Sequence, residues 1–231
     1  MDNGDGFVSF STIEFLKLSP GLQRGIVRKS FGILRPGLRD INFGAVERAI
    51  GFVARPTKTK QQDLIAGVGI RIEGKRVFLA AWEADLPNLG WPQLPEEKLS
   101  FEVPESLEFG DGWRLTAEYS NDLEKSRQAA YANSNPFLAW VDIDELNSPM
   151  LVRKRKSGDR FHPLGMDGHS IKLADFFINV KIPSRAREAW PLIIFEDDIV
   201  WVPGYRIGHN FRLRSSTRKV GKLKLERTKN R

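Results

Sequence analysis

The chain has 231 residues, of which 41% are hydrophobic, and it carries a formal net charge of +7. This length suits one large domain or two to three small ones, and the hydrophobic content is ordinary for a globular protein. The sequence has no apolar run long enough to cross a bilayer and no signal-peptide pattern, and without cysteine it can form no disulfide or thiolate site. We therefore expect a cytoplasmic protein.

The charge is distributed unevenly along the chain. Residues 11–60 have a net charge of +7, residues 61–149 of −9, and residues 150–231 of +11. Two basic blocks thus flank an acidic one, which suggests two separate contacts with a polyanion. A solvated basic surface would give the same pattern, so charge alone leaves both interpretations open.

Residues 1–83 are predicted to form a small helical domain that ends in a β-hairpin. Ser19-Pro20 is typical of a helix N-cap followed by proline in the first turn, and this helix is expected to end near Leu34. Asn42 is a candidate cap for a further helix. Apolar residues alternate within residues 64–83 on both sides of a Glu-Gly-Lys turn, as they do in a hairpin.

The acidic segment 84–148 is predicted to be a linker followed by strands that pack on the C-terminal part. Residues 85–95 contain three prolines, which is typical of a linker. Residues 122–135 are polar and fit either a long loop or a short helix. Strand-like runs occur at residues 101–103, 113–119 and 137–142.

The stretch Val152–Pro183 joins a basic run to a glycine-bent loop and a predicted helix. Ser170 is a candidate N-cap, and Pro183 cannot continue the helix. Apolar residues fall at the i, i+3, i+4 and i+7 positions of one helical face: Leu173, Phe176, Phe177 and Val180. A helix pinned by this face would leave the nearby cations close to solvent, which suits the binding of a phosphate backbone.

Residues 192–202 are predicted to form a hairpin around Glu196-Asp197-Asp198, and Val220–Leu225 a last strand. We interpret the acidic residues as a turn rather than as metal ligands or acid–base groups. The three histidines lack metal-ligand spacing, and neither a Walker loop nor a dinucleotide-binding glycine motif occurs. No metal, cofactor or catalytic residue is therefore predicted in this chain.

A set of short motifs runs through the C-terminal third of the chain. They are Gly158-Asp159-Arg160-Phe161, Pro163-Leu164-Gly165-Met166, Gly168, Lys172-Leu173, Asp175-Phe176-Phe177-Ile178, Lys181-Ile182-Pro183, Trp190-Pro191-Leu192, Trp201-Val202-Pro203-Gly204 and Arg206-Ile207. Together they resemble the C-terminal domain of bacterial tRNA(Ile)-lysidine synthetases. Residues 18–24 and 34–41 carry a weaker resemblance to the helical middle domain of the same family.

The resemblance implies a tRNA-binding chain without the catalytic domain of that family, whose Ser-Gly-Gly-x-Asp-Ser phosphate loop is absent from this sequence. In the whole enzyme, an ATP-dependent ligase, ATP adenylates C2 of the wobble cytidine (C34) of tRNA-Ile with a CAU anticodon. Lysine then displaces AMP to give lysidine. This chain alone is predicted to be inactive, with ATP and magnesium bound only by a PP-loop domain that it lacks. It would be a fragment or a split gene product.

The resemblance also implies that basic residues of this chain contact the acceptor stem and the body of the tRNA. Candidates in the C-terminal domain, residues 149–231, are Arg153, Arg155, Arg160, Lys172, Lys181, Arg185 and Arg206. Candidates in the first domain are Arg24, Arg28 and Arg39. Arg160 could instead pair with Asp159 or another acid. Ile171 stands where a second lysine often precedes Lys172 in the family, which would lower acceptor-stem affinity.

The predicted fold class is therefore α+β, with a mixed C-terminal domain that has a short sheet and one main helix. Other functions stay open. The chain could be a module that forms a homodimer or docks a separate catalytic subunit, or a stand-alone RNA-binding protein. It could also be a hydrolase that uses Asp197, Asp198 or His162. No contact with a membrane is expected.

Overall fold

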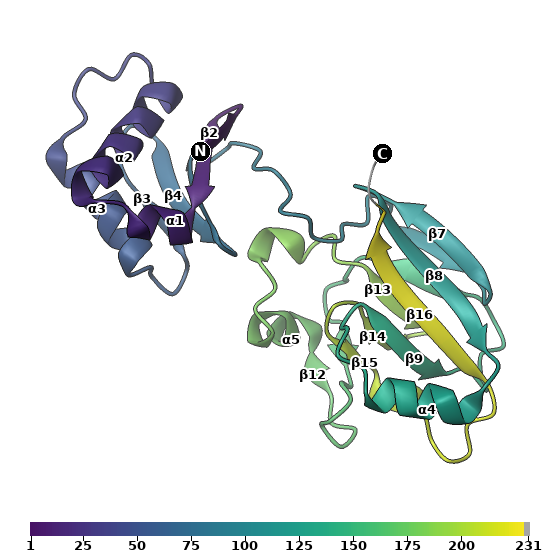
Figure 1. Ribbon diagram of the computed structural model, residues 1–231. Helices are drawn as coiled ribbons and strands as arrows, with labels where there is room; N and C mark the ends of the chain where they lie inside the picture. The colour runs from purple at the N-terminus through teal and green to yellow at the C-terminus, as the bar shows by residue number, and fades with distance from the viewer. Residues whose placement is uncertain (229–231) are drawn as a thin grey trace. The chain divides into compact units, whose positions relative to one another are not determined.

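The computed structural model describes residues 1–228. It has the α+β fold that was predicted, with several antiparallel sheets, and it divides into two compact units (Figure 1). The first unit is Met1–Asn88, and the second begins at Leu89. Residues 89–148 therefore share a unit with the C-terminal part of the chain. Within the described residues, no helix is both long and apolar enough to span a bilayer.

The first unit is built on a five-stranded antiparallel sheet in the order β1-β2-β5-β4-β3. Its strands are β1 (Asp2–Gly4), β2 (Phe7–Ser11), β3 (Gln61–Asp63), β4 (Val68–Glu73) and β5 (Arg76–Ala81). The predicted hairpin is confirmed as β4 and β5. It is the centre of a larger sheet because β2 and β3 add to its two edges, which short-range alternation could not reveal.

Three helices complete the first unit: α1 (Thr12–Lys17), α2 (Pro20–Leu34) and α3 (Phe43–Ala54). The predicted start at Ser19-Pro20 is confirmed, and the Asn42 side chain accepts a hydrogen bond from the Ala45 amide at 2.7 Å. Apolar residues of α2 and α3 form one buried cluster with alternate residues of the sheet, among them Phe31, Phe52 and Ile70. This amphipathic match covers one face of the sheet.

The second unit contains two antiparallel sheets that share one core. The first has the order β15-β14-β13-β10-β6 and the second the order β7-β8-β16-β9. Their strands are β6 (Lys98–Phe101), β7 (Glu105–Phe109), β8 (Trp113–Ser120), β9 (Leu138–Asp142), β10 (Met150–Arg153), β13 (Leu192–Phe195), β14 (Asp198–Val202), β15 (Arg206–Ile207) and β16 (Val220–Arg227). Side chains from both sheets, such as Leu115 and Trp201, lie in the same buried cluster.

The five-stranded sheet of the second unit is buried on both faces. Ile193 of β13 faces the core shared with the other sheet, whereas its neighbours Leu192 and Ile194 face a separate cluster around the short helix α5 (Leu173–Asn179). This explains why the β13 run Leu-Ile-Ile-Phe is apolar without alternation. The sheets are more extensive than the short sheet predicted because strands of residues 98–142 complete them.

Further elements of this unit are β11 (Arg160–Phe161), β12 (Ile171–Lys172), α4 (Leu123–Tyr131) and the 3-10 helices η1 (Ser184–Ala186) and η2 (His209–Phe211). The predicted helix after the glycine-bent loop begins at Leu173 rather than near Ser170. Ser170 does not cap it, because the Ser170 hydroxyl accepts a hydrogen bond from the Arg160 Nε at 2.9 Å. The helix ends before Pro183, as predicted.

Candidate nucleic-acid interface

Two exposed cations lie directly opposite each other in the two-stranded ladder β11–β12. Arg160 is the antiparallel partner of Lys172, and both side chains are exposed. Opposed residues of such a ladder are about 4.5–5.5 Å apart, and like charges there repel each other. Among residues 1–228, no carboxylate pairs with either side chain. The pair therefore forms a small surface that favours a bound anion.

The charge of Arg160 is held in place by neutral groups. Its Nε and Nη2 donate to the Ser170 hydroxyl at 2.9 and 2.6 Å, and Nη2 also approaches the Ser170 carbonyl oxygen at 3.2 Å. The alternative in which Arg160 pairs with Asp159 is not seen, because Asp159 binds Arg153 instead. Because its acceptors are uncharged, Arg160 keeps its full positive charge while its guanidinium group is oriented.

The ladder rests on a rigid apolar support. Leu173, Phe176 and Phe177 of α5 are buried, and the ring of Phe176 packs edge-on against Phe161 with 5.0 Å between the ring centroids. Phe161 lies next to Arg160 in β11, so the packing of its ring fixes the backbone that carries the cation. The predicted apolar face of this helix is thus confirmed, and it packs beneath the strand that carries Arg160.

Two further predicted cations border this support. Lys181 is exposed directly after α5 and has φ of +62°, in the left-handed conformation that often ends a helix. Arg206 of β15 is also exposed, and its Nη1 donates to the Leu164 carbonyl oxygen at 2.9 Å. Arg206 therefore attaches β15 to the loop between β11 and β12 without losing its charge to a carboxylate.

Arg153 does not fit the prediction of a free contact with RNA. It is buried, and its two terminal nitrogens donate to the two oxygens of Asp159 at 2.8 and 2.9 Å. Burial raises the pKa of Asp159, but hydrogen bonds from Arg153 and from the Lys156 amide outweigh that effect and hold the pKa below its usual value. The charge of Arg153 is therefore satisfied inside the domain.

The remaining predicted cations of the second unit have partners at the surface. Arg155 is half-buried and forms an ion pair with Glu188. Arg185 is also half-buried, and its guanidinium carbon lies 5.3 Å from the centre of the Trp91 ring. These contacts compete with a phosphate group, so Arg155 and Arg185 are less available to RNA than Arg160 and Lys172.

The predicted cations of the first unit differ in the same way. Arg24 forms an ion pair with Glu47 at 2.7 Å and lies over the ring of Phe43. Arg28 on α2 and Arg39 in the loop before α3 are exposed. Of these three residues, Arg28 and Arg39 have the unneutralised charge that a phosphate contact requires.

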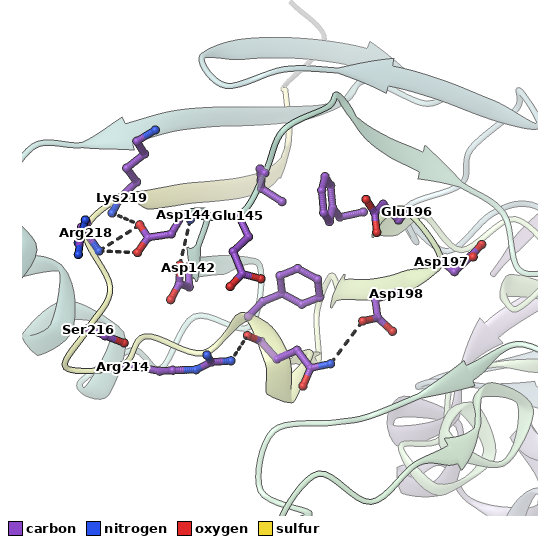
Figure 2. A pocket seen from close by; sticks show the side chains of 14 residues that line it. Asp142, Asp144, Glu145, Glu196, Asp197, Asp198, Arg214, Ser216, Arg218 and Lys219 are labelled. Atoms are coloured by element: carbon purple, nitrogen blue, oxygen red, sulfur yellow. Dashed lines mark hydrogen bonds between the residues drawn. The ribbon is translucent and has the colours of Figure 1, made fainter.

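A cavity of about 840 Å³ in the second unit brings six carboxylates near three basic residues (Figure 2). Asp144 accepts hydrogen bonds from the main-chain amides of Arg218 and Lys219, and Asp142 accepts one from the Thr217 hydroxyl at 2.6 Å. These two carboxylates thus hold the chain segment that precedes β16 in place. Within residues 1–228, no group of three or more aspartate, glutamate or histidine residues is arranged to hold a metal ion.

Residues Glu196-Asp197 form the turn between β13 and β14, as predicted. Asp198, labelled in Figure 2, begins β14 and accepts a hydrogen bond from the Asn210 side chain at 3.3 Å. The contact ties η2 to the hairpin. It is a structural role, and no nucleophile is paired with Asp198 in the described chain.

Three arginines that line a groove, Arg127, Arg212 and Arg214, were not among the site residues predicted from the sequence. Arg127 comes from α4 in the acidic segment, and Arg212 follows η2. Both line this groove with Arg206, although Arg127 is far from the other two in sequence. The only signal for Arg212 was the basic composition after residue 205, and Arg127 had none because acidic residues surround it in the chain.

Residues 150–224 contain the Arg160–Lys172 ladder and its apolar support within an α+β unit, and a family model described as the TilS substrate C-terminal domain matches those residues. The chain is similar to the C-terminal portion of tRNA(Ile)-lysidine synthases, which confirms the resemblance seen in its motifs.

The chain is 31% identical over 221 residues to the tRNA(Ile)-lysidine synthase of Dehalococcoides mccartyi (strain CBDB1), covering 94% of this chain and 44% of that protein. It is 41% identical over 213 residues to the enzyme of the same name from Caldanaerobacter subterraneus subsp. tengcongensis, covering 90% and 41%. It thus spans less than half the length of these relatives. A solved structure described as "Crystal structure of TILS C-terminal domain" aligns with 58% of this chain and 99% of its own, with 26% identity and a TM-score of 0.46.

Proposed function

We propose that this chain binds tRNA as the substrate-recognition part of a tRNA(Ile)-lysidine synthase. The observation that carries the proposal is the opposed pair of Arg160 and Lys172 on a rigid support, inside the residues that match the family model. Phosphate contacts position a nucleic acid without reading its sequence. Two opposed cations without a carboxylate partner repel each other, and a bound phosphate backbone would reduce this repulsion.

The exposed cations of this surface favour duplex RNA. A-form RNA is recognised mainly through its backbone and its shallow minor groove, because side chains cannot enter its deep major groove. Exposed cations on the short ladder, and at Lys181 directly after α5, can contact a backbone in this way. We assign this surface to the acceptor stem, and we assign Arg28 and Arg39 of the first unit to a second contact on the tRNA body.

In the whole protein, the recognised tRNA would be tRNA-Ile with a CAU anticodon. The reaction would be ATP-dependent attachment of lysine to C34, which makes the whole protein a carbon–nitrogen ligase of tRNA processing. ATP and magnesium would be bound by the part of the relatives that this chain does not span. With tRNA as its substrate, the protein would work in the cytoplasm.

Filter binding of a tRNA-Ile transcript to the full chain tests the proposal. We expect the double variant Arg160→Ala/Lys172→Ala to bind about 10- to 100-fold more weakly at low salt, and the difference to shrink as salt is raised. Lys222→Ala is the matched control, because Lys222 is already paired with Glu118. Circular dichroism verifies folding, and an unchanged affinity of the folded double variant would refute the assignment of this surface.

A further inference from the structure

A groove of about 1130 Å³ in the second unit combines aromatic rings with arginines. Its lining comes from α4, from β9, from the loop after β11 and from the segment between β15 and β16. Four arginines line it, and its lining includes no aspartate or glutamate within the described chain. Its character is the opposite of the acidic cavity, even though Arg214 borders both.

Two of the aromatic residues that line the groove, Tyr131 and Trp140, present exposed ring surface. Tyr131, the last residue of α4, is 96% exposed. Trp140 of β9 is half-buried, and because its neighbours Ala139 and Val141 point into the core, Trp140 points to the outer face of the sheet. Because the Tyr131 side chain is almost fully exposed, its ring contributes no buried apolar surface to the stability of the fold, and the ring is available for stacking on a base.

The arginines of the groove are oriented by main-chain oxygens. Arg206 donates to Leu164 O at 2.9 Å, Arg212 to His209 O at 2.7 Å, and Arg127 to Arg214 O at 3.1 Å. These acceptors fix the guanidinium groups without cancelling their charge. In the described chain, the one carboxylate that pairs with a groove arginine is Glu124, which lies 3.9 Å from Arg127.

We propose that this groove binds a short single-stranded segment of RNA. Proteins hold single strands by stacking the bases on aromatic side chains while a positive groove follows the backbone, and the groove provides both elements. A duplex cannot use the rings, because its base faces are already stacked on one another. Charge complementarity also selects a polyanion over an apolar peptide for a groove with four arginines.

The inference rests on the proposed function and extends it. Leu164 lies in the loop that joins the two strands of the Arg160–Lys172 ladder, and its carbonyl oxygen binds Arg206 of the groove. The groove and the ladder are therefore connected through one loop. An RNA duplex held at the ladder would continue into the groove as an unpaired extension.

Fluorescence anisotropy with labelled RNA hairpins tests the inference on the full chain. One hairpin is blunt, and two others carry four unpaired nucleotides at the 3′ end or at the 5′ end. We expect one extended hairpin to bind at least tenfold more tightly than the blunt one. Tyr131→Ala should reduce this advantage to less than about threefold, Tyr131→Phe should retain it, and neither should alter binding of the blunt hairpin.

The matched control is Tyr119→Ala, because Tyr119 is an exposed tyrosine on β8 outside the groove. Equal affinity of the native chain for all three hairpins would overturn the groove assignment and leave tRNA binding intact. An advantage that survives Tyr131→Ala unchanged would overturn it as well. Failure to bind any of the hairpins would overturn the proposed function itself, and loss of all binding on Arg160→Ala/Lys172→Ala would support that function independently.

Discussion

Arg153 and Asp159 form a two-point ion pair in the second unit, with Nη1 to Oδ2 at 2.8 Å and Nη2 to Oδ1 at 2.9 Å. Both side chains are nearly enclosed, with exposed fractions of 9% and 12%. Asp159 also accepts a hydrogen bond from the Lys156 amide at 2.7 Å. The pair closes the turn between β10 and β11, so it positions the strand that carries Arg160.

Replacement of one partner should destabilise the second unit strongly. Asp159→Asn keeps the size of the side chain but leaves the Arg153 charge buried without a counter-ion, which typically costs about 3–5 kcal/mol. Urea unfolding followed by tryptophan fluorescence measures this, because five of the six tryptophans lie in the second unit. Asp197→Asn, in an exposed turn, is the control and should change stability by less than about 0.5 kcal/mol. Equal effects of the two changes would contradict a structural role for the pair.

The same pair should make stability depend on pH in the acid range. The folded-state pKa of Asp159 is lowered, so its contribution is complete above the unfolded pKa of about 3.9 and is lost as pH falls through the lower folded value. The stability difference between the native chain and Asp159→Asn should therefore be constant from pH 7 to 5 and shrink below about pH 4. Urea midpoints measured across this range test the sign, and a difference that grows on acidification would contradict it.

Local sequence patterns correctly predicted those features that depend only on neighbouring residues in the chain. The Asn42 cap and the α2 start were correct because each depends on residues within one helical turn. The cap at Ser170 was wrong because the Arg160 side chain, ten residues earlier, takes the hydroxyl as its acceptor. The capping pattern cannot show that an arginine of another strand will bind the serine hydroxyl.

The candidate site shows a similar limit. Arg153 and Arg160 are indistinguishable as members of a basic stretch, yet one is enclosed with Asp159 and the other is exposed beside Ser170. The groove could not be predicted for another reason. Arg127 and Arg212 line the same groove only after β9 and β16 have paired. Charge counts therefore left a polyanion contact and a solvated basic surface both open, whereas tertiary pairing decides which cations are exposed together.

The hydrogen bonds from Arg160 to Ser170 suggest a separate test of how that cation is positioned. Ser170→Ala removes the hydroxyl acceptor and leaves the charge, so the guanidinium must be ordered when RNA binds, at a cost of about 0.5–1.5 kcal/mol. We expect about 2- to 10-fold weaker tRNA binding with an unchanged salt dependence, measured by filter binding at several salt concentrations. Ser157→Ala, an exposed serine in the neighbouring turn, should have no effect. A reduced salt slope for Ser170→Ala would indicate that a phosphate contact itself was lost.

Gly208 should tolerate no side chain, because the second unit brings main chain against it. A Cβ atom there would lie 2.3 Å from the Ile199 carbonyl oxygen and 3.1 Å from the Phe211 ring. The Gly208 amide also donates to Val200 O at 2.7 Å, and Gly208 bridges to Pro163 of the loop between β11 and β12. Gly208→Ala must therefore push β14 away from this loop, and overpacking of this kind costs about 1–3 kcal/mol.

Gly51→Ala provides a control of opposite sign for Gly208→Ala. Gly51 lies inside α3, and nothing is within 4 Å of the position its Cβ would take. Alanine is the better helix former there, so the change should stabilise the first unit by about 0.5–1 kcal/mol. The midpoints of thermal unfolding of the two variants should thus shift in opposite directions.

Because Leu164 and Arg206 flank the displaced contact, Gly208→Ala should also weaken binding of an extended RNA hairpin more than binding of a blunt one. Equal weakening of both hairpins would mean that the loop between β11 and β12 acts on the ladder alone.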